Sequence, residues 1–92
     1  MMSQGNPPYA VVLTRAAARG LSKLPKKDLE RILAKAQGLE DNPRPRGVEK
    51  LTDRGERYRI RSGDYRIVYL IDDEERLVEI ETIGNRRDVY RE

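Results

Sequence analysis

Alternating polar and apolar residues mark two neighbouring segments in the second half of the chain. Over residues 57–61, arginines alternate with a tyrosine and an isoleucine, as in a β-strand with one buried face. Residues 65–71 form a second β-prone run, and Gly63-Asp64 between the two runs is a two-residue hairpin signal. The pattern therefore predicts an antiparallel β-hairpin.

The length of the hairpin loop decides which side chains share a face of the sheet. In the two-residue register Arg61 faces Arg66, whereas a slip of one residue would push Arg66 in among the apolar side chains. We therefore predict four cross-strand pairs: Ser62 with Tyr65, Arg61 with Arg66, Ile60 with Ile67, and Tyr58 with Tyr69. This register gathers the arginines on one open face, namely Arg57, Arg59, Arg61 and Arg66. Like charges repel at such spacing, and a bound polyanion would offset this repulsion, so a polyanion is the partner that we expect for this face.

Apolar residues at helical spacing fill much of the first half of the chain. After a short β-prone run at residues 9–13, Thr14 suits the N-cap of a first helix. Pro25 interrupts the pattern, and a second helix is predicted over residues 26–40, before Asp41-Asn42-Pro43. The two helices form an αα-hairpin whose shared apolar side can cover one face of a small sheet.

The third strand of the sheet is predicted at residues 76–83 and ends at Gly84-Asn85. Two sets of side chains are expected on its opposite faces: Val78, Ile80 and Thr82 on one, and Glu79 and Glu81 on the other. The two glutamates are placed to pair with neighbouring arginines.

The whole pattern describes a single domain over residues 9–91. Residues 43–55 lack periodicity and are expected to form a solvated connecting loop, and residues 1–8 a disordered N-terminal extension. The predicted fold class is α+β, in which an N-terminal strand and an αα-hairpin pack on a small antiparallel sheet.

Composition narrows the chemistry that the chain can perform. The 92 residues include no cysteine and no histidine, so disulfides and nucleophile–histidine triads are excluded and any zinc site would be all-carboxylate. We expect no metal and no cofactor. The net charge is only +3, so the crowding of arginines on the hairpin and near the C-terminus is the stronger indication of a nucleic-acid partner. No apolar run approaches membrane-spanning length and no secretion signal is present, which predicts a cytoplasmic protein with no membrane partner.

The open arginine face suggests a chemistry directed at phosphate. Arginine presents a planar fork of donors that matches phosphate oxygens, and several arginines around one phosphodiester would neutralise the charge that grows during a displacement. RNA supplies its own nucleophile, the 2′-hydroxyl, so such a reaction needs no metal. Exposed arginines are also commonly solvated or paired with acids. The residues alone therefore favour a basic sheet that binds nucleic acid and leave cleavage open.

Several segments, in their order and spacing, resemble a known toxin family. The most specific are YRIRSGDYRIVY at residues 58–69 and IGNRRDVY at residues 83–90, and they follow TRAAA at 14–18, LSKLP at 21–25 and GVEKL at 47–51. From residue 9 to residue 91 the chain resembles the RelE/ParE superfamily of toxins from prokaryotic toxin–antitoxin modules. For RelE-like members the resemblance implies an endoribonuclease (mRNA interferase) that cleaves mRNA in the ribosomal A site. It also implies metal-independent attack by the 2′-hydroxyl, inhibition of translation, and a cognate antitoxin as partner.

The resemblance also assigns site residues. The family's active-site positions fall on Arg59, Arg61, Arg66, Arg86 and Tyr90. It implies that Arg66 and Arg86 stabilise the scissile phosphate, while Tyr90 orients the substrate. By the chemistry of its phenol, Tyr90 can also stack on an unpaired base or pass a proton. Further RNA contacts are expected from Lys50, Arg54, Arg57 and Arg87. RelE itself carries lysines at the positions of Arg59 and Arg61, and many relatives carry histidine at the position of Asn85.

Two other functions share the same scaffold. The ParE-like branch implies a non-catalytic inhibitor of DNA gyrase that leaves RNA intact. A third reading is an inactive module that only binds an antitoxin.

Overall fold

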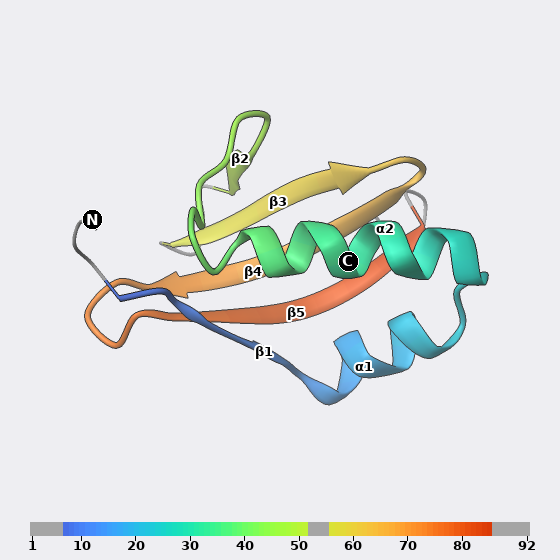
Figure 1. The fold of residues 1–92 in the computed structure, drawn as a ribbon, viewed down its shortest axis with the longest axis horizontal. Coiled ribbons are helices and arrows are strands. Elements are labelled where there is room, and N and C mark those ends of the chain that lie inside the picture. The colour runs from blue at the N-terminus through green and yellow to red at the C-terminus, as the bar shows by residue number, and fades with distance from the viewer. Residues whose placement is uncertain (1–6, 52–55, 86–92) are drawn as a thin grey trace.

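A computed structural model describes residues 7–51 and 56–85 of the chain. The elements follow one another as β1 (Ala10–Leu13), α1 (Arg15–Ser22), α2 (Lys26–Gly38), β2 (Glu49–Leu51), β3 (Arg57–Ser62), β4 (Tyr65–Asp72) and β5 (Leu77–Asn85) (Figure 1). The predicted α+β class is confirmed.

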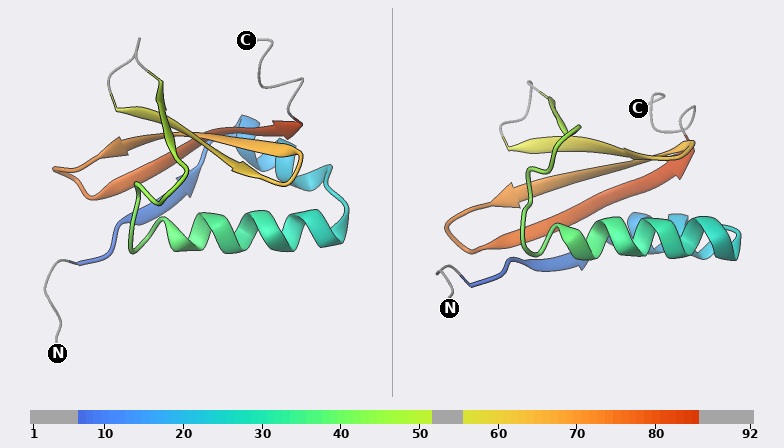
Figure 2. Two further views of the ribbon diagram at one scale, coloured as in Figure 1. Left: turned by 90° about the horizontal axis from the view of Figure 1, so that it is seen from above. Right: turned by 45° about the horizontal axis from the view of Figure 1, so that its top comes forward.

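The strands form one five-stranded sheet in the order β1-β5-β4-β3-β2. Strands β3, β4 and β5 pair with one another antiparallel, as predicted. Strand β2 pairs antiparallel with β3 at one edge of the sheet, and β1 pairs in parallel with β5 at the other. The first strand of the chain and the last described one are therefore neighbours in space. Both helices lie on the same side of the sheet, and the described residues place no helix on the other side (Figure 2).

The core lies between that helical layer and the sheet. Ala17 of α1 and Ile32 of α2 are fully buried with Ile67 and Tyr69 of β4 and Ile80 of β5. Tyr58 and Ile60 point to the same layer, which leaves their arginine neighbours for the open face. The alternation of the sequence thus sets the two faces of β3 as expected.

Thr14 caps α1, as the sequence predicts. Its side-chain oxygen accepts a hydrogen bond of 3.1 Å from the backbone N–H of Ala17 and donates one of 2.7 Å to the carbonyl of Glu81. The cap therefore also ties the start of α1 to β5.

Gly20 explains how closely α1 approaches the sheet. A Cβ atom at this position would lie 2.2 Å from the carbonyl oxygen of Ile83, a backbone atom of β5. Only glycine permits this contact, so the residue that weakens the helix by propensity makes its packing possible.

The hairpin register is confirmed at all four predicted pairs. The pairs are Ser62 with Tyr65, Arg61 with Arg66, Ile60 with Ile67 and Tyr58 with Tyr69. Gly63 adopts φ +61°, the left-handed conformation that the tight loop requires.

Three local predictions were wrong. Residues 43–55 were expected to be loop throughout, yet Glu49–Leu51 forms β2 and pairs with β3. Gly84-Asn85 does not end the third strand, because β5 continues through Asn85. Thr82 was predicted on the same face as Val78 and Ile80, but a bulge in β5 opposite Val68 and Tyr69 shifts the register. Thr82 therefore pairs with Val68 and is exposed, and Ile83 is buried instead.

Candidate nucleic-acid interface

A basic cavity lies at the edge of β3 beyond the end of β2. Strand β2 pairs only with residues 57–59, so in the described part of the chain no strand covers residues 60–62 on that side. The cavity there has a volume of about 310 Å³ and is lined by Lys35, Arg46, Gly47, Glu49, Arg59, Ile60, Arg61 and Arg66. Five of these side chains are cationic and one is anionic, which makes the cavity a site for an anion.

Arg61 and Arg66 stand directly opposite each other across β3 and β4. Arg61 is exposed, whereas Arg66 is only 4% exposed. Charge acts over a longer range where water is excluded, so the nearly buried Arg66 strengthens the positive potential of the cavity floor. The cavity is therefore lined by one exposed and one nearly buried guanidinium.

Glu49 is the only acid that lines the cavity within the described residues. Its carboxylate accepts hydrogen bonds of 3.1 Å from Nε and 2.5 Å from Nη2 of Arg59. Arg59 holds the pKa of Glu49 below its usual range, and Arg61 and Arg66 lower it further. The carboxylate therefore partly neutralises the cluster and occupies the donors of Arg59 that a phosphate would take.

The loop after α2 is fixed to the sheet by two tyrosines. The hydroxyl of Tyr69 donates to the carbonyl oxygen of Pro43 at 2.7 Å, and Nε of Arg44 donates to the hydroxyl of Tyr58 at 3.0 Å. Arg44 also bridges two carboxylates, Glu56 and Asp73, each at 2.9 Å from Nη2. These bonds hold the loop where Arg46 and Gly47 reach the cavity.

The same network shifts several pKa values. Hydrogen bonds from Arg44 hold the pKa of Asp73 and of Glu56 below their ordinary values. Burial raises the pKa of the Tyr69 phenol. The carboxylates are thus anionic partners of Arg44, and the phenol is a neutral donor.

The predicted site residues divide into four groups. Arg59, Arg61 and Arg66 are brought together at the cavity. Arg57 lies on the same open face outside the cavity, where its Nε contacts Glu81 at 2.8 Å as the sequence suggested. Lys50 faces Tyr58 and therefore points to the opposite side of the sheet from Arg57 and Arg59, where it lies 3.7 Å from Glu56. Four further candidates lie outside the described residues: Arg54, Arg86, Arg87 and Tyr90.

Three charged residues of the cavity were missed by sequence reasoning: Lys35, Arg46 and Glu49. Lys35 belongs to the outer face of α2, and Arg46 and Glu49 flank the turn at Gly47, which has φ +90°. The Arg46-Gly47 pair was a usable signal, because a glycine turn beside a cation often brings backbone and charge to one ligand. Its position relative to β3 depends on contacts far apart in the chain.

Clusters of metal ligands and helices that could span a membrane are both absent from the described part of the chain. No cluster of three or more potential ligands among their acidic side chains could hold a metal ion. None of the helices in this part of the chain is long and apolar enough to cross a membrane.

Comparison with known proteins assigns the fold to a family. Residues 11–90 match the family of ParE toxins of the type II toxin–antitoxin system parDE. The chain belongs to the RelE/ParE superfamily of toxins. Within this superfamily, the toxin RelE of Mycobacterium tuberculosis is 40% identical over 85 residues, which cover 91% of this chain and 88% of that toxin. RelG of the same organism is 36% identical over 85 residues, with 91% and 98% covered.

A solved RelE structure supports the same assignment. A chain of the archaeal RelE–RelB complex from Pyrococcus horikoshii OT3 has a TM-score of 0.78 and 32% identity, covering 86% of this chain and 96% of that one. Sequence and fold together make this chain a toxin of the RelE kind from a type II toxin–antitoxin system, and they do not favour the ParE-like alternative.

Proposed function

We propose that this toxin is a ribosome-dependent endoribonuclease that cleaves mRNA in the A site and so inhibits translation. The observation that carries the proposal is that Arg59, Arg61 and Arg66 line one cavity. Lys35 and Arg46 line the same cavity. A concentration of guanidinium groups at one hollow of this size fits a phosphodiester better than a peptide or an apolar ligand.

The cleavage step follows from the chemistry of RNA. The 2′-hydroxyl oxygen attacks the adjacent phosphorus, the bond from phosphorus to the 5′-oxygen breaks, and a 2′,3′-cyclic phosphate remains. The 2′-hydroxyl gives up a proton and the leaving 5′-oxygen takes one. Arg61 and Arg66 neutralise the charge that grows on the phosphate oxygens, which is the largest contribution that a rigid cationic site can make.

Arginine does not accept the proton from the 2′-hydroxyl, because its pKa lies above about 12. The arginines of the cavity therefore act by charge and orientation. In the proposal Arg86 joins them at the scissile phosphate, and Tyr90 orients the nucleotide, as the family resemblance implies.

We further propose that a cognate antitoxin binds this chain, as RelB does in the complex from Pyrococcus horikoshii OT3. An exposed cationic cavity favours a partner that brings carboxylates or covers Arg66. Action on translating ribosomes places the toxin in the cytoplasm.

The test is translation in a cell-free system with one defined mRNA, followed by mapping of its 5′ ends. The wild-type toxin is expected to cut only ribosome-bound message, and Arg61→Ala to lose at least about tenfold in rate, since one charge-assisted contact to the transition state is worth 1.4 kcal/mol or more. Arg19→Ala removes an exposed arginine of α1 that lies outside the cavity and is expected to cut normally. Inhibited supercoiling by gyrase with intact mRNA would overturn the proposal in favour of the ParE-like function.

A further inference from the structure

A row of cations runs along α2 outside the cavity. Lys27, Arg31 and Lys35 are exposed and lie four residues apart, so they occupy successive turns on one side of the helix. Each step advances about 6 Å along the axis. We call these three side chains the α2 ridge.

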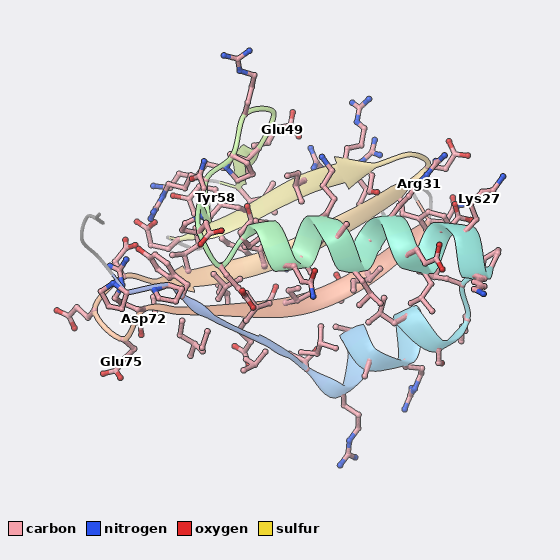
Figure 3. The ribbon with its side chains drawn as sticks, in the orientation of Figure 1. Lys27, Arg31, Glu49, Tyr58, Asp72 and Glu75 are labelled. Atoms are coloured by element: carbon pink, nitrogen blue, oxygen red, sulfur yellow. The ribbon has the colours of Figure 1, made fainter. Side chains whose placement is uncertain are left out.

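The α2 ridge is continuous with the cavity. Lys35 lines the cavity itself, and Nη1 of Arg31 lies 3.9 Å from the position that a Cβ on Gly63 would take. Figure 3 places Lys27 and Arg31 toward the beginning of α2, near the β3–β4 turn. The ridge therefore leads from the cavity along the hairpin to the start of the helix.

Neither of the two acids of α2 makes an ion pair with the ridge among the described residues. Asp28 follows Lys27 but interacts with the phenol of Tyr65, where it adds to the effect of burial in raising the tyrosine pKa. Glu30, which precedes Arg31, is exposed.

Ion pairing separates the basic residues of this region into two sets. Arg44, Lys50, Arg57 and Arg59 each lie within 4.0 Å of a carboxylate. Within the described residues, no carboxylate makes an ion pair with the α2 ridge, Arg46 or Arg61. Because like charges four residues apart destabilise a helix, an unpaired row beside a cavity that Glu49 neutralises only in part is a feature that folding does not favour.

We infer that the α2 ridge is a backbone-binding track for single-stranded RNA that continues from the cavity. The inference rests on the proposed function for the identity of the polyanion. Contacts from lysine and arginine to phosphates carry no sequence information, so the track binds without regard to sequence and holds the nucleotides that flank the scissile one. A single strand fits because a duplex would not let one phosphodiester enter the cavity.

The test measures the salt dependence of RNA binding by fluorescence anisotropy. The probe is a 2′-O-methyl single strand of about twelve nucleotides, within the range that single-strand sites occupy, and it resists cleavage. The ridge variant is Lys27→Gln/Arg31→Gln/Lys35→Gln. The matched control is Arg15→Gln/Arg19→Gln/Lys23→Gln, which removes the same charge from exposed positions of α1 and its C-cap.

The ridge variant is expected to have a shallower slope of log affinity against log salt, by about 2, since each phosphate contact on a single strand contributes about 0.7. The control variant and the charge-preserving Lys27→Arg/Arg31→Lys/Lys35→Arg keep the wild-type slope. A 2′-O-methyl dinucleotide, which occupies the cavity alone, binds the double variant Lys27→Gln/Arg31→Gln, which keeps Lys35 in the cavity, with less than a twofold loss. Thermal unfolding checks that each variant is folded.

Equal slopes for the ridge and control variants would overturn the track. That result leaves the proposed function standing if cleavage still depends on Arg61. Conversely, a shallower slope in the ridge variant, with no cleavage of ribosome-bound mRNA by the wild type, rejects the nuclease proposal and keeps the track.

Discussion

The phenol of Tyr69, at the centre of the sheet, donates a buried hydrogen bond of 2.7 Å to the carbonyl oxygen of Pro43 in the loop after α2. The bond joins residues 26 positions apart in the sequence. It fixes one end of the loop that brings Arg46 and Gly47 to the cavity. The folded core and the basic site are therefore coupled through one side chain.

Tyr69→Phe removes that donor and leaves a buried carbonyl without it. We expect the free energy of unfolding to fall by about 1–3 kcal/mol, the range for an unsatisfied buried polar group. RNA affinity should fall as well, because Arg46 is no longer held beside the cavity. Urea denaturation and anisotropy measure the two effects, and an unchanged denaturation midpoint would contradict the first.

Gly20→Ala should destabilise the fold through a backbone clash. The added methyl group would meet the carbonyl oxygen of Ile83, and α1 would have to move away from β5. We expect a loss of roughly 1–3 kcal/mol, as for overpacked interiors. Gly38→Ala is the matched control, because no atom lies within 4 Å of its Cβ position and the helix gains up to about 1 kcal/mol of propensity. Thermal or urea unfolding of both variants should therefore shift in opposite directions.

Acid sensitivity should depend on Arg44. The folded-state pKa values of Asp73 and Glu56 are lowered by Arg44, so their contribution to stability is present above the unfolded values and is lost as the pH falls. We expect the wild type to lose stability below about pH 4, near the ordinary values of these carboxyl groups, and Arg44→Met to show a flatter acid limb. The variant still loses some stability at low pH, because Arg59 also lowers the pKa of Glu49.

The measurement is the urea midpoint between pH 2 and 6. Arg46→Met serves as the control, because this arginine comes from the same loop but makes no ion pair within the described residues. Superimposable acid limbs for Arg44→Met and the wild type would show that the bridge does not govern the acid response.

Glu49→Gln should tighten RNA binding. The change removes the carboxylate partner of Arg59 from the cavity. We expect a roughly twofold to fivefold gain at low salt, because an exposed ion pair is weak, and a salt slope steeper by about 0.7. Glu75→Gln changes the net charge equally from the turn before β5 and should bind like the wild type (Figure 3). Weaker binding by Glu49→Gln would mean that this carboxylate orients Arg59 for the ligand.

Local patterns were enough to predict the hairpin and its faces. Gly63-Asp64 fixes the loop length, and the alternation from Arg57 to Arg61 fixes the rest of the register, so the meeting of Arg61 and Arg66 follows from neighbouring residues alone. The same holds for the cap at Thr14, which depends on a contact three residues away.

Features that depend on contacts between distant residues could not be predicted from the sequence. Strand β2 has three residues and exists only because β3 pairs with it. No characteristic residue type in the sequence marks the bulge before Thr82. Lys35 and Arg46 reach the cavity because Tyr58 and Tyr69 hold the intervening loop, a relationship that no spacing in the chain encodes. Of the six charged residues that line the cavity, Arg59, Arg61 and Arg66 were therefore predictable, whereas the other three, Lys35, Arg46 and Glu49, were not.

The parallel pairing of β1 with β5 separates the two ends of the described chain in a practical way. Ala10 lies beside Leu77, while Gly84, further along β5, lies beside Arg66 at the basic site. A fluorescent dye or purification handle attached at Ala10 would therefore stand at the far end of the sheet from the basic cavity. The same group attached at Gly84 would stand beside Arg66 and obstruct the cavity.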